Sequence, residues 1–349
     1  MNLLPTAEQS ELAAAAARFL ATAVPVSGAV SRAGNGGGAS ADPGAVWQEM
    51  ADLGWLAIGV SAELGGAGGS TADQALLFRE LGRALAPGPL LGTALGVALA
   101  VAAGRHDLAG PLMAGDTAAA LAEPWRDASA TVGGTAGAGI VSGRFRVLDL
   151  DTAGWVTVIT PNGLALLAAG PVGAEALRLP APDPTVPVSL VALHSSSAEL
   201  VVTDLAETGV LAAKGRILAA ALLVGILEAV RDVSVAYVRQ REQFGKPIGS
   251  FQAVKHRCAD MAVRAEAAGS LLWLAALSLD TGAPEAERLA ASVKALASEY
   301  AVVSAHDNVQ NHGGMGFTAE CSAHLYVKRA LEWSVTLGSP DLLLAEVAR

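Results

Sequence analysis

The chain has 349 residues, 52% of them hydrophobic, and its 33 Asp and Glu outnumber its 23 Lys and Arg for a net charge of −10. This length supports two or three structural units that share a sizeable core. The negative charge leaves no basic stripe for DNA or RNA, so we expect no nucleic-acid partner.

Cysteine and histidine are sparse. Cys258 and Cys321 are too few for a disulfide framework, and neither has a Cys or His neighbour at the spacing of metal ligands. We expect both to be small buried side chains in a reducing cytoplasm, and we predict no metal site.

The sequence gives no sign of an export signal or a membrane span. Near the N-terminus, Glu8 and Glu11 occupy positions where an export signal needs basic residues. The longest apolar stretches, 89–104 and 217–227, are shorter than the about 18–20 clean residues that cross a bilayer. Both are predicted to be core helices.

Residues 7–115 have a helical pattern, interrupted by a Gly- and Ser-rich linker at 34–44. Ser70 or Thr71 is placed to cap a helix, and Pro87 stops it. The region is predicted to be an all-helical unit.

Residues 117–203 are rich in Val, Thr, Gly and Pro. The runs "WVTVIT" and "LALLAAG" flank an Asn-Gly turn at 161–163, which predicts a β-hairpin. Two more strands are predicted within 188–203, so this region is expected to form a small β domain.

From Leu211 onward the pattern is helical again. Apolar residues step by three and four along successive helices, which predicts a bundle. In one of these helices the predicted buried stripe is Leu289, Val293, Leu296, Tyr300 and Val303.

The predicted fold is a multi-domain α+β protein. It consists of an all-helical N-terminal domain, a small middle β domain and a C-terminal four-helix bundle, with boundaries at 1–115, 116–205 and 206–349.

The first stretch that could carry chemistry is "RQREQFGKPIGSFQ", from Arg239 to Gln252. It is predicted to join a helix ending near Gln240 to one capped by Ser250. Arg241 offers a planar five-donor fork that suits a phosphate or pyrophosphate. The residues alone fit equally well with a plain turn whose charges are solvated.

The second stretch is "VQNHGGMGFTAE", residues 309–320. Its glycines allow the backbone to approach a ligand closely, but a glycine-rich helix end is more often only a C-cap. Alone, this stretch is a weak indication of a site.

Together, the order and spacing of these stretches resemble the acyl-CoA dehydrogenases. R-x-x-F-G-K-x-I-x-x-F-Q is followed about sixty residues later by Q-x-x-G-G-x-G-F. "WQEMADLGWLAIGVSAELGGAGGS", "FRELGRALAPGP" and "ALAEP" are also similar to that family, so the resemblance covers nearly the whole chain. It implies FAD, an acyl-CoA substrate that is desaturated at its α,β bond, and an electron-transfer flavoprotein or similar acceptor.

The resemblance also implies which residues bind the cofactor. In the family both stretches contact the ADP portion of an FAD that a neighbouring subunit mainly holds. By similarity the contacting residues here are Arg241, Gln243, Phe244, Gln252, Gln310, Gly313 and Gly314.

The sequence departs from the family at the catalytic base, the carboxylate that removes a proton from the α carbon. The usual position falls on Leu337, just before Gly338 and Ser339. The position used by some relatives, next to an arginine, falls on Gly215 before Arg216. Neither residue can take a proton, so no catalytic residue is assigned to this chain.

The nearest acids to Leu337 are Glu320 and Glu332. Glu320 is interpreted as a structural acid and Glu332 as a solvated one. The middle domain departs from the family as well: "WRDASATVG" (125–133) replaces a Gly-Ser-Asp turn and "GRFRVLDLD" (143–151) replaces a Trp-Ile-Thr stretch. These changes predict a weakened site for this subunit's own isoalloxazine ring.

Three functions follow from this combination. The first is the base-lacking subunit of a heteromeric dehydrogenase, resembling paired actinobacterial enzymes and forming an α2β2 heterotetramer with a homologous subunit. The second is a non-catalytic scaffold or binding protein, and the third is a flavin oxidase or monooxygenase on the same fold.

Overall fold

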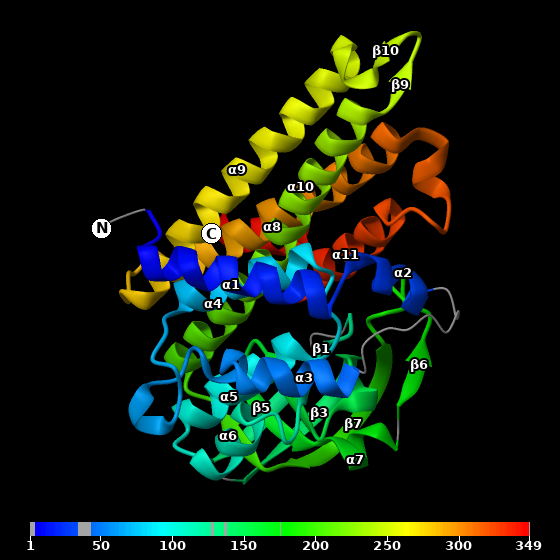
Figure 1. Ribbon diagram of the computed structural model, residues 1–349. Coiled ribbons are helices and arrows are strands. Elements are labelled where there is room, and N and C mark those ends of the chain that lie inside the picture. Colours follow the sequence, from blue (N-terminus) through cyan, green and yellow to red (C-terminus); the bar gives the residue numbers. More distant parts are fainter. Residues whose placement is uncertain (1–3, 34–42, 127–128, 136–137, 175, 349) are drawn as a thin grey trace. The chain divides into compact units, whose positions relative to one another are not determined.

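The described chain packs as two compact units in a computed structural model (Figure 1). The structure describes residues 4–33, 43–126, 129–135, 138–174 and 176–348, so most of the predicted linker at 34–44 lies outside it. The helical unit contains Met1–Ala41, Ala75–Ala86 and Arg216–Arg349, and the sheet unit contains Asp42–Gln74 and Pro87–Gly215. The three predicted domain boundaries remain a prediction.

The helical unit is a bundle in which α10 packs against α9, α11 and α12. Helices α4 and α8 each continue from one unit into the other. The unit's elements are α1 (Ala7–Ala23), α2 (Val26–Ala33), α4 (Thr71–Arg83), α8 (Leu205–Gln240), β9 (Glu242–Gln243), β10 (Lys246–Pro247), η4 (Ile248–Ser250), α9 (Gln252–Asp280), α10 (Ala286–His312), η5 (Gly313–Phe317), α11 (Ala323–Val335) and α12 (Pro340–Val347).

The sheet unit combines an eight-stranded sheet, in the order β6-β7-β3-β1-β4-β5-β8 with β2 paired to β3, with short helices. The helices and turns are α3 (Pro43–Asp52), η1 (Trp55–Ala57), η2 (Ala62–Leu64), α5 (Leu90–Ala102), α6 (His106–Met113), η3 (Leu150–Thr152) and α7 (Ala169–Gly173). The strands are β1 (Ala119–Pro124), β2 (Thr131–Thr135), β3 (Ala138–Leu148), β4 (Trp155–Thr160), β5 (Gly163–Ala168), β6 (Leu177–Leu179), β7 (Val188–Ala198) and β8 (Leu200–Val202).

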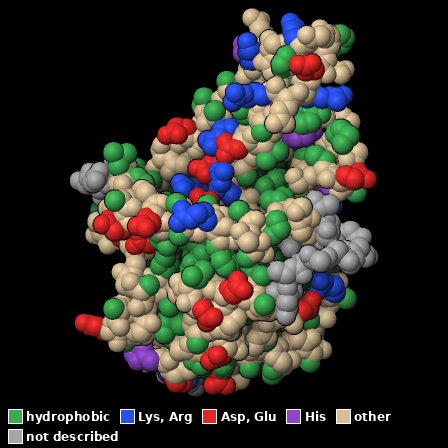
Figure 2. Space-filling view, in the orientation of Figure 1, with side chains coloured by type: hydrophobic (Ala, Val, Ile, Leu, Met, Phe, Trp, Pro, Cys, Tyr) green, Lys and Arg blue, Asp and Glu red, His purple; other side chains and the backbone are tan. Residues whose placement is uncertain are grey.

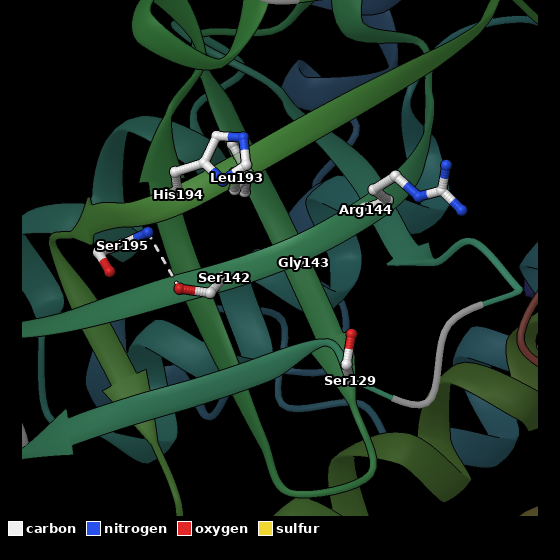
Figure 3. Close-up of a pocket in the computed structure, with 7 residues that line it drawn as sticks. All are labelled: Ser129, Ser142, Gly143, Arg144, Leu193, His194 and Ser195. Atoms are coloured by element: carbon white, nitrogen blue, oxygen red, sulfur yellow. Dashed lines mark hydrogen bonds between the residues drawn. The ribbon is translucent and has the colours of Figure 1, made fainter.

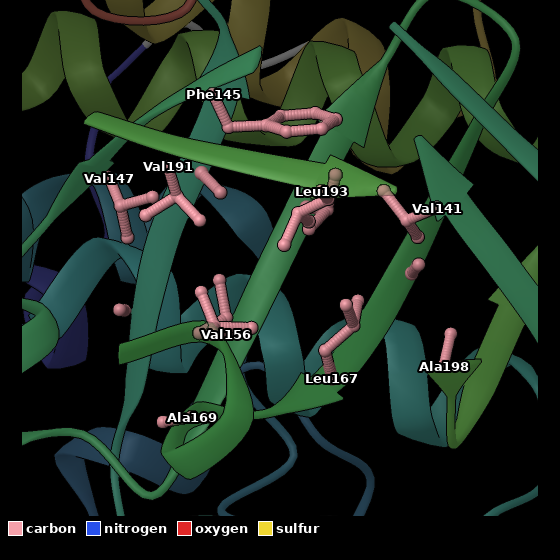
Figure 4. Packing of buried hydrophobic residues seen from close by; sticks show 14 of the residues in the cluster. Val141, Phe145, Val147, Val156, Leu167, Ala169, Val191, Leu193 and Ala198 are labelled. Carbon is pink, nitrogen blue, oxygen red and sulfur yellow. The ribbon is translucent and has the colours of Figure 1, made fainter. Parts of the chain in front are cut away.

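The β predictions are confirmed. Strands β4 and β5 form the predicted hairpin, with Thr160 opposite Gly163, and β7 and β8 are the two further strands. Side chains that alternate along the strands form the apolar core of the sheet unit (Figure 4), because successive strand residues point to opposite faces. Among its members are Val141, Phe145, Val147, Val156, Leu167, Val191 and Leu193.

Helix α4 begins and ends as predicted. The Ser70 hydroxyl accepts from the Asp73 amide at 3.1 Å, and the Asp73 carboxylate accepts from the Ser70 amide at 2.7 Å. This reciprocal pair caps the first turn, and the helix ends at Arg83, before Pro87.

Two glycines bring α4 and α8 into backbone contact. A Cβ on Gly225 would lie 1.9 Å from the Arg79 carbonyl oxygen, and one on Gly82 would lie 2.1 Å from the Leu222 carbonyl oxygen. Ion pairs border this contact: Arg83 reaches Glu228 at 3.0 Å and Asp232 at 2.8 Å. The position of α8 in its unit is therefore set by a close approach that only glycine permits.

The stripe predicted for α10 is wrong in part. Val293 is buried, but Leu289, Leu296 and Tyr300 are half-buried and Val303 is 41% exposed. Most of the buried residues of α10 are small instead, which lets neighbouring helices approach closely; they include Ala290, Ala291, Ala297, Ser298, Ala301, Ser304 and Ala305.

Two of the described helices, α8 and α9, are long and apolar enough to cross a membrane by length and composition alone. In α8, 78% of the most apolar window is buried inside the fold, as in a core helix. The predicted core helices at 217–227 and 89–104 correspond to part of α8 and to α5, and both are buried.

We predict that Gly225→Ala destabilises the protein by more than about 3 kcal/mol, because the added methyl would collide with the Arg79 carbonyl in a backbone contact that cannot relax without moving a helix. Urea unfolding measures the loss. The control is Gly269→Ala on α9, whose Cβ would meet only Val224 at 4.0 Å. It should be neutral or stabilising by up to about 1 kcal/mol, and equal effects of the two changes would contradict the described contact.

We predict that the buried phenol of Tyr326 makes the protein less stable at alkaline pH. Its hydroxyl donates to the Arg83 carbonyl at 3.0 Å, and burial raises its pKa to about 12, although Arg83 and Arg329 act in the opposite direction. The phenol of the unfolded chain ionises near pH 10, whereas the buried phenol stays neutral up to about pH 12. The contribution of Tyr326 to the free energy of unfolding is therefore complete below pH 10 and is lost between about pH 10 and 12.

The comparison is wild type against Tyr326→Phe in urea unfolding from pH 9 to 12. The stability advantage of wild type should shrink by about 2 kcal/mol over this range. If the difference in stability between wild type and Tyr326→Phe stays constant over this range, the phenol has the same pKa in the folded and unfolded states.

Candidate functional site

The first motif forms a tight hairpin between α8 and α9. Strands β9 and β10 pair with Gln243 opposite Lys246, and the two turn residues, Phe244 and Gly245, have φ of 53° and 76°. Positive φ at both positions is typical of a type I′ turn. A phenylalanine held in this conformation is strained, and strain of this kind gathers at functional positions.

The hairpin presents its side chains outward. Phe244 is 91% exposed, with its ring edge-on to Phe251 at 6.1 Å, and the Lys246 ammonium lies 4.5 Å from the centre of the Phe251 ring. Arg241 is also exposed and has no ion-pair partner in the described part of the chain. Basic side chains gather at this end of the α8–α9 pair (Figure 2).

Two amides complete the first motif. Gln243 and Gln252 are exposed, and the Gln243 amide donates to the Glu242 carbonyl at 2.7 Å. The end of α8 at Gln240 is confirmed. The predicted cap at Ser250 is wrong: Ser250 belongs to the short turn η4, and Phe251 occupies the N-cap of α9 without a side-chain hydrogen bond.

The second motif forms the end of α10. Gly313 has φ of 59° and ψ of −140°, a conformation open almost only to glycine, and its amide donates to the Gln310 carbonyl. A Cβ on Gly313 or Gly314 would meet nothing within 4 Å, whereas one on Gly316 would lie 2.6 Å from the Val309 carbonyl oxygen. The backbone is therefore open at Gly313 and Gly314 and packed at Gly316.

Aromatic stacking brings the two motifs to the same end of the bundle. The rings of Tyr237 and His312 stack at 4.2 Å with 25° between their planes, and the Tyr237 hydroxyl donates to the His312 carbonyl at 3.5 Å. Tyr237 lies one helical turn before Arg241, and His312 directly precedes Gly313. The seven residues assigned by similarity thus lie at three helix ends: the end of α8 with its hairpin, the start of α9 and the end of α10.

This end of the bundle has the chemistry that the ADP half of FAD needs. Arg241 supplies a charged fork for a pyrophosphate, and the Gly313–Gly314 backbone can approach one closely. Phe244, Met315 at 53% exposure and Phe317 at 81% exposure offer apolar surface to a flat ring or to another subunit. The residues present therefore fit this part of the cofactor.

The predicted base position lies in a turn after α11. Leu337 is half-buried with φ of 59°, and Gly338 follows with φ of 113°. Lys294 of α10 is fully buried beneath the turn, where its ammonium donates to Ser298 Oγ at 2.9 Å, the Ser334 carbonyl at 3.1 Å and the Gly338 carbonyl at 3.3 Å. The buried Lys294 ammonium therefore holds this turn in place, although residue 337 in the turn is a leucine and not an acid.

The alternative base position, Gly215, lies within α8. Its neighbour Arg216 makes a two-pronged ion pair with Glu346 of α12, at 2.7 and 2.8 Å. Sequence reasoning missed Glu346, because more than a hundred residues separate it from Arg216. Its carboxylate is held by the guanidinium.

The two acids considered from the sequence differ in exposure. Glu320 is exposed, and its interpretation as a structural acid remains a prediction. The interpretation of Glu332 as solvated is wrong: it is 3% exposed, on the buried side of α11.

In the middle domain, a buried ion pair joins the altered stretch 143–151 to the family-like stretch "ALAEP". Arg146 and Glu123 are paired across β3 and β1, with side chains only 8% and 13% exposed. Arg126, with φ of 52°, lies over the Trp125 ring at 5.0 Å. Asp127 and Ala128 of the altered turn lie outside the described residues.

Neither cysteine forms a disulfide, and both are only partly buried rather than buried as predicted. Burial nevertheless raises the pKa of the Cys258 thiol, while nearby Arg257 lowers it, so the thiolate is disfavoured. No group of three potential metal ligands occurs in the part of the chain that the structure describes.

Known proteins match along most of the chain. The family profiles described as acyl-CoA dehydrogenase N-terminal domain and C-terminal domain match residues 6–108 and 208–349. The acyl-CoA dehydrogenase IpdE2 of Mycobacterium tuberculosis is 34% identical over 305 residues, which cover 86% of this chain and 84% of that protein.

Solved structures agree in fold. Butyryl-CoA dehydrogenase from Megasphaera elsdenii matches with a TM-score of 0.83 at 20% identity, covering 100% of this chain and 99% of that one. The protein described as "Tcur3481-Tcur3483 steroid ACAD G363A variant" matches with a TM-score of 0.84 at 24% identity, covering 98% and 96%. The predicted α+β architecture is confirmed, and the chain belongs to the acyl-CoA dehydrogenase family of FAD-dependent oxidoreductases.

Proposed function

We propose that this chain is the base-lacking subunit of a heteromeric acyl-CoA dehydrogenase. It would bind the ADP half of an FAD held mainly by a homologous partner chain, which supplies the catalytic carboxylate. The observation that supports the proposal is an exposed Arg241 hairpin in a chain that has Leu337 and Gly215 at the positions where the family resemblance places the base.

Each assigned residue has a role toward the cofactor. FAD, when bound, accepts a hydride from the β carbon of the acyl thioester. Arg241 binds the pyrophosphate through its guanidinium, the amides of Gln243, Gln252 and Gln310 orient the nucleotide, and Phe244 covers a ring face. Gly313 and Gly314 have no side chains, so the phosphates can approach the backbone at the end of α10 closely.

The partners follow from this role. The substrate is an acyl-CoA, the electron acceptor is an electron-transfer flavoprotein or a similar protein, and the assembly is an α2β2 heterotetramer in the cytoplasm. The structural neighbour named for two components, the Tcur3481-Tcur3483 steroid ACAD, supports a two-component enzyme. The exposed Phe244 and Phe317 support an interface at this end of the bundle.

One observation favours a second candidate, a non-catalytic scaffold of the same fold. Arg146 of the altered stretch 143–151 is buried in an ion pair with Glu123, so this stretch serves an internal charge pair rather than a contact to a flavin ring. The outward Arg241 hairpin favours the dehydrogenase subunit, because a scaffold has no use for a strained, exposed phenylalanine beside an unpaired arginine.

Removing the Arg241 guanidinium separates these two functions. Arg241→Ala should lower FAD affinity about ten- to a hundredfold, because a charge-assisted contact to a phosphate contributes about 1.5–3 kcal/mol. Assembly should persist, because Arg241 is exposed and none of the described helix packing uses it. Bound FAD is measured on the complex co-expressed with the genomic neighbour that co-purifies.

Arg288→Ala provides the matched control, since it removes an exposed arginine at the opposite end of α10. It should leave the flavin content unchanged. If the Arg241→Ala complex also retains all its FAD, the scaffold is favoured.

Restoring a carboxylate at the usual base position should not restore catalysis. We predict that Leu337→Glu produces no more desaturation than Leu337→Gln in the purified single chain, because the middle-domain contacts for the flavin ring are altered as well. Turnover is measured with an artificial electron acceptor. A large gain specific to glutamate would show that this chain has a working flavin site of its own.

A further inference from the structure

A break in the sheet opens a cavity on the face of strands β3 and β7. The pairing of these strands is regular on both sides of an irregularity between Val141 and Gly143. Gly143 has φ of 131°, and a Cβ there would lie 2.7 Å from the Cα of Ala130, so only glycine admits the neighbouring loop. Strand irregularities of this kind often adjoin binding sites.

The cavity is widely open to solvent and has room for a small ligand. It measures about 430 Å³, within the range of small-molecule sites. Figure 3 shows its lining, with Arg144 and His194 rising from adjacent strands and serine hydroxyls around the bulge. The lining residues are Ser129, Ser142, Gly143, Arg144, Leu193, His194 and Ser195.

The cavity lining is basic, whereas the chain as a whole is acidic. Acids outnumber bases overall, yet none of the described lining residues is acidic. Arg146 and Arg178 of the same sheet are paired with Glu123 and Asp151. Arg144 has no carboxylate partner among the described residues, so its charge remains available to an anion.

Hydroxyl groups complete a set of donors. The Ser142 hydroxyl accepts from the Ser195 amide at 3.0 Å, which leaves its hydrogen to point elsewhere. Ser195 itself has φ of 53°, a strained conformation for a serine at the rim of a cavity. A guanidinium fork, an imidazole N–H and several hydroxyls match the many acceptor oxygens of a phosphate better than the two of a carboxylate.

We propose that this cavity binds the phosphate group of a small phosphomonoester, with the sugar or nucleoside body in the remaining volume. Two sources share this chemistry: the 3′-phosphorylated adenosine of a coenzyme A thioester, and a free phosphorylated metabolite. The proposal does not rest on the flavin site, which belongs to the other unit of the chain.

Isothermal titration of the full chain, as purified, distinguishes these sources. The probes are adenosine 3′,5′-bisphosphate, adenosine 5′-monophosphate, glucose 6-phosphate and adenosine. Binding of the bisphosphate alone supports the proposal with coenzyme A as the source, and binding of all three phosphates supports it with a free metabolite as the source. Binding of adenosine as tightly as the bisphosphate, or of no phosphate at millimolar concentration, overturns it.

Variants place the binding in this cavity. Arg144→Gln should weaken phosphate binding about tenfold or more, and His194→Gln should weaken it less. Arg178→Gln removes the same charge from a paired position of the same sheet and should change nothing. Because the nucleotide half-site of the flavin could also take adenosine phosphates, the titration is repeated on Arg241→Ala. Binding that survives Arg144→Gln but is lost in Arg241→Ala overturns the proposal.

Discussion

The contact between α4 and α8 is the constraint on which the helical unit depends. Gly82 and Gly225 let the two backbones touch, and the Arg83 ion pairs with Glu228 and Asp232 border that contact. With α8 fixed there, its far end is fixed as well, because a long helix transmits position along its axis. Stacking between Tyr237 and His312 then sets the end of α10 beside it, so the geometry of the candidate flavin site begins about four turns away, at two glycines.

Local signals in the sequence were sufficient where a few neighbouring residues decide the structure. The β4–β5 hairpin forms where the turn signal predicts it, with Pro161 and Asn162 as the turn residues between paired Thr160 and Gly163, and Ser70 with Asp73 defines the start of α4. The apolar stripe predicted for α10 is wrong in part because alanine and serine pack well although they are weak hydrophobes, so hydrophobicity alone misses much of the buried face. Glu332 was misjudged because its burial depends on packing around α11, which its neighbours in sequence do not reveal.

The candidate site was found by motif spacing, and the structure adds what spacing lacks. Sequence assigned Arg241 and Gly313 to one ligand only through resemblance, whereas the stacked rings supply a physical link between their helices. The exposure of Phe244 was not visible in the sequence, since its positive φ arises from the register of a hairpin of two-residue strands. Glu346 escaped notice for a similar reason, because only the packing of α12 brings it to Arg216.

Lys294 has a consequence for how this chain can change over evolutionary time. Its ammonium supports the turn at Leu337 through backbone carbonyls, and backbone carbonyls are the same whatever side chain the turn carries. The hydrogen bonds from Lys294 to this turn thus do not depend on which side chain residue 337 carries, whereas loss of the lysine would leave buried acceptors unpaired. Of the two positions, Lys294 is therefore the one that selection for a folded chain holds in place.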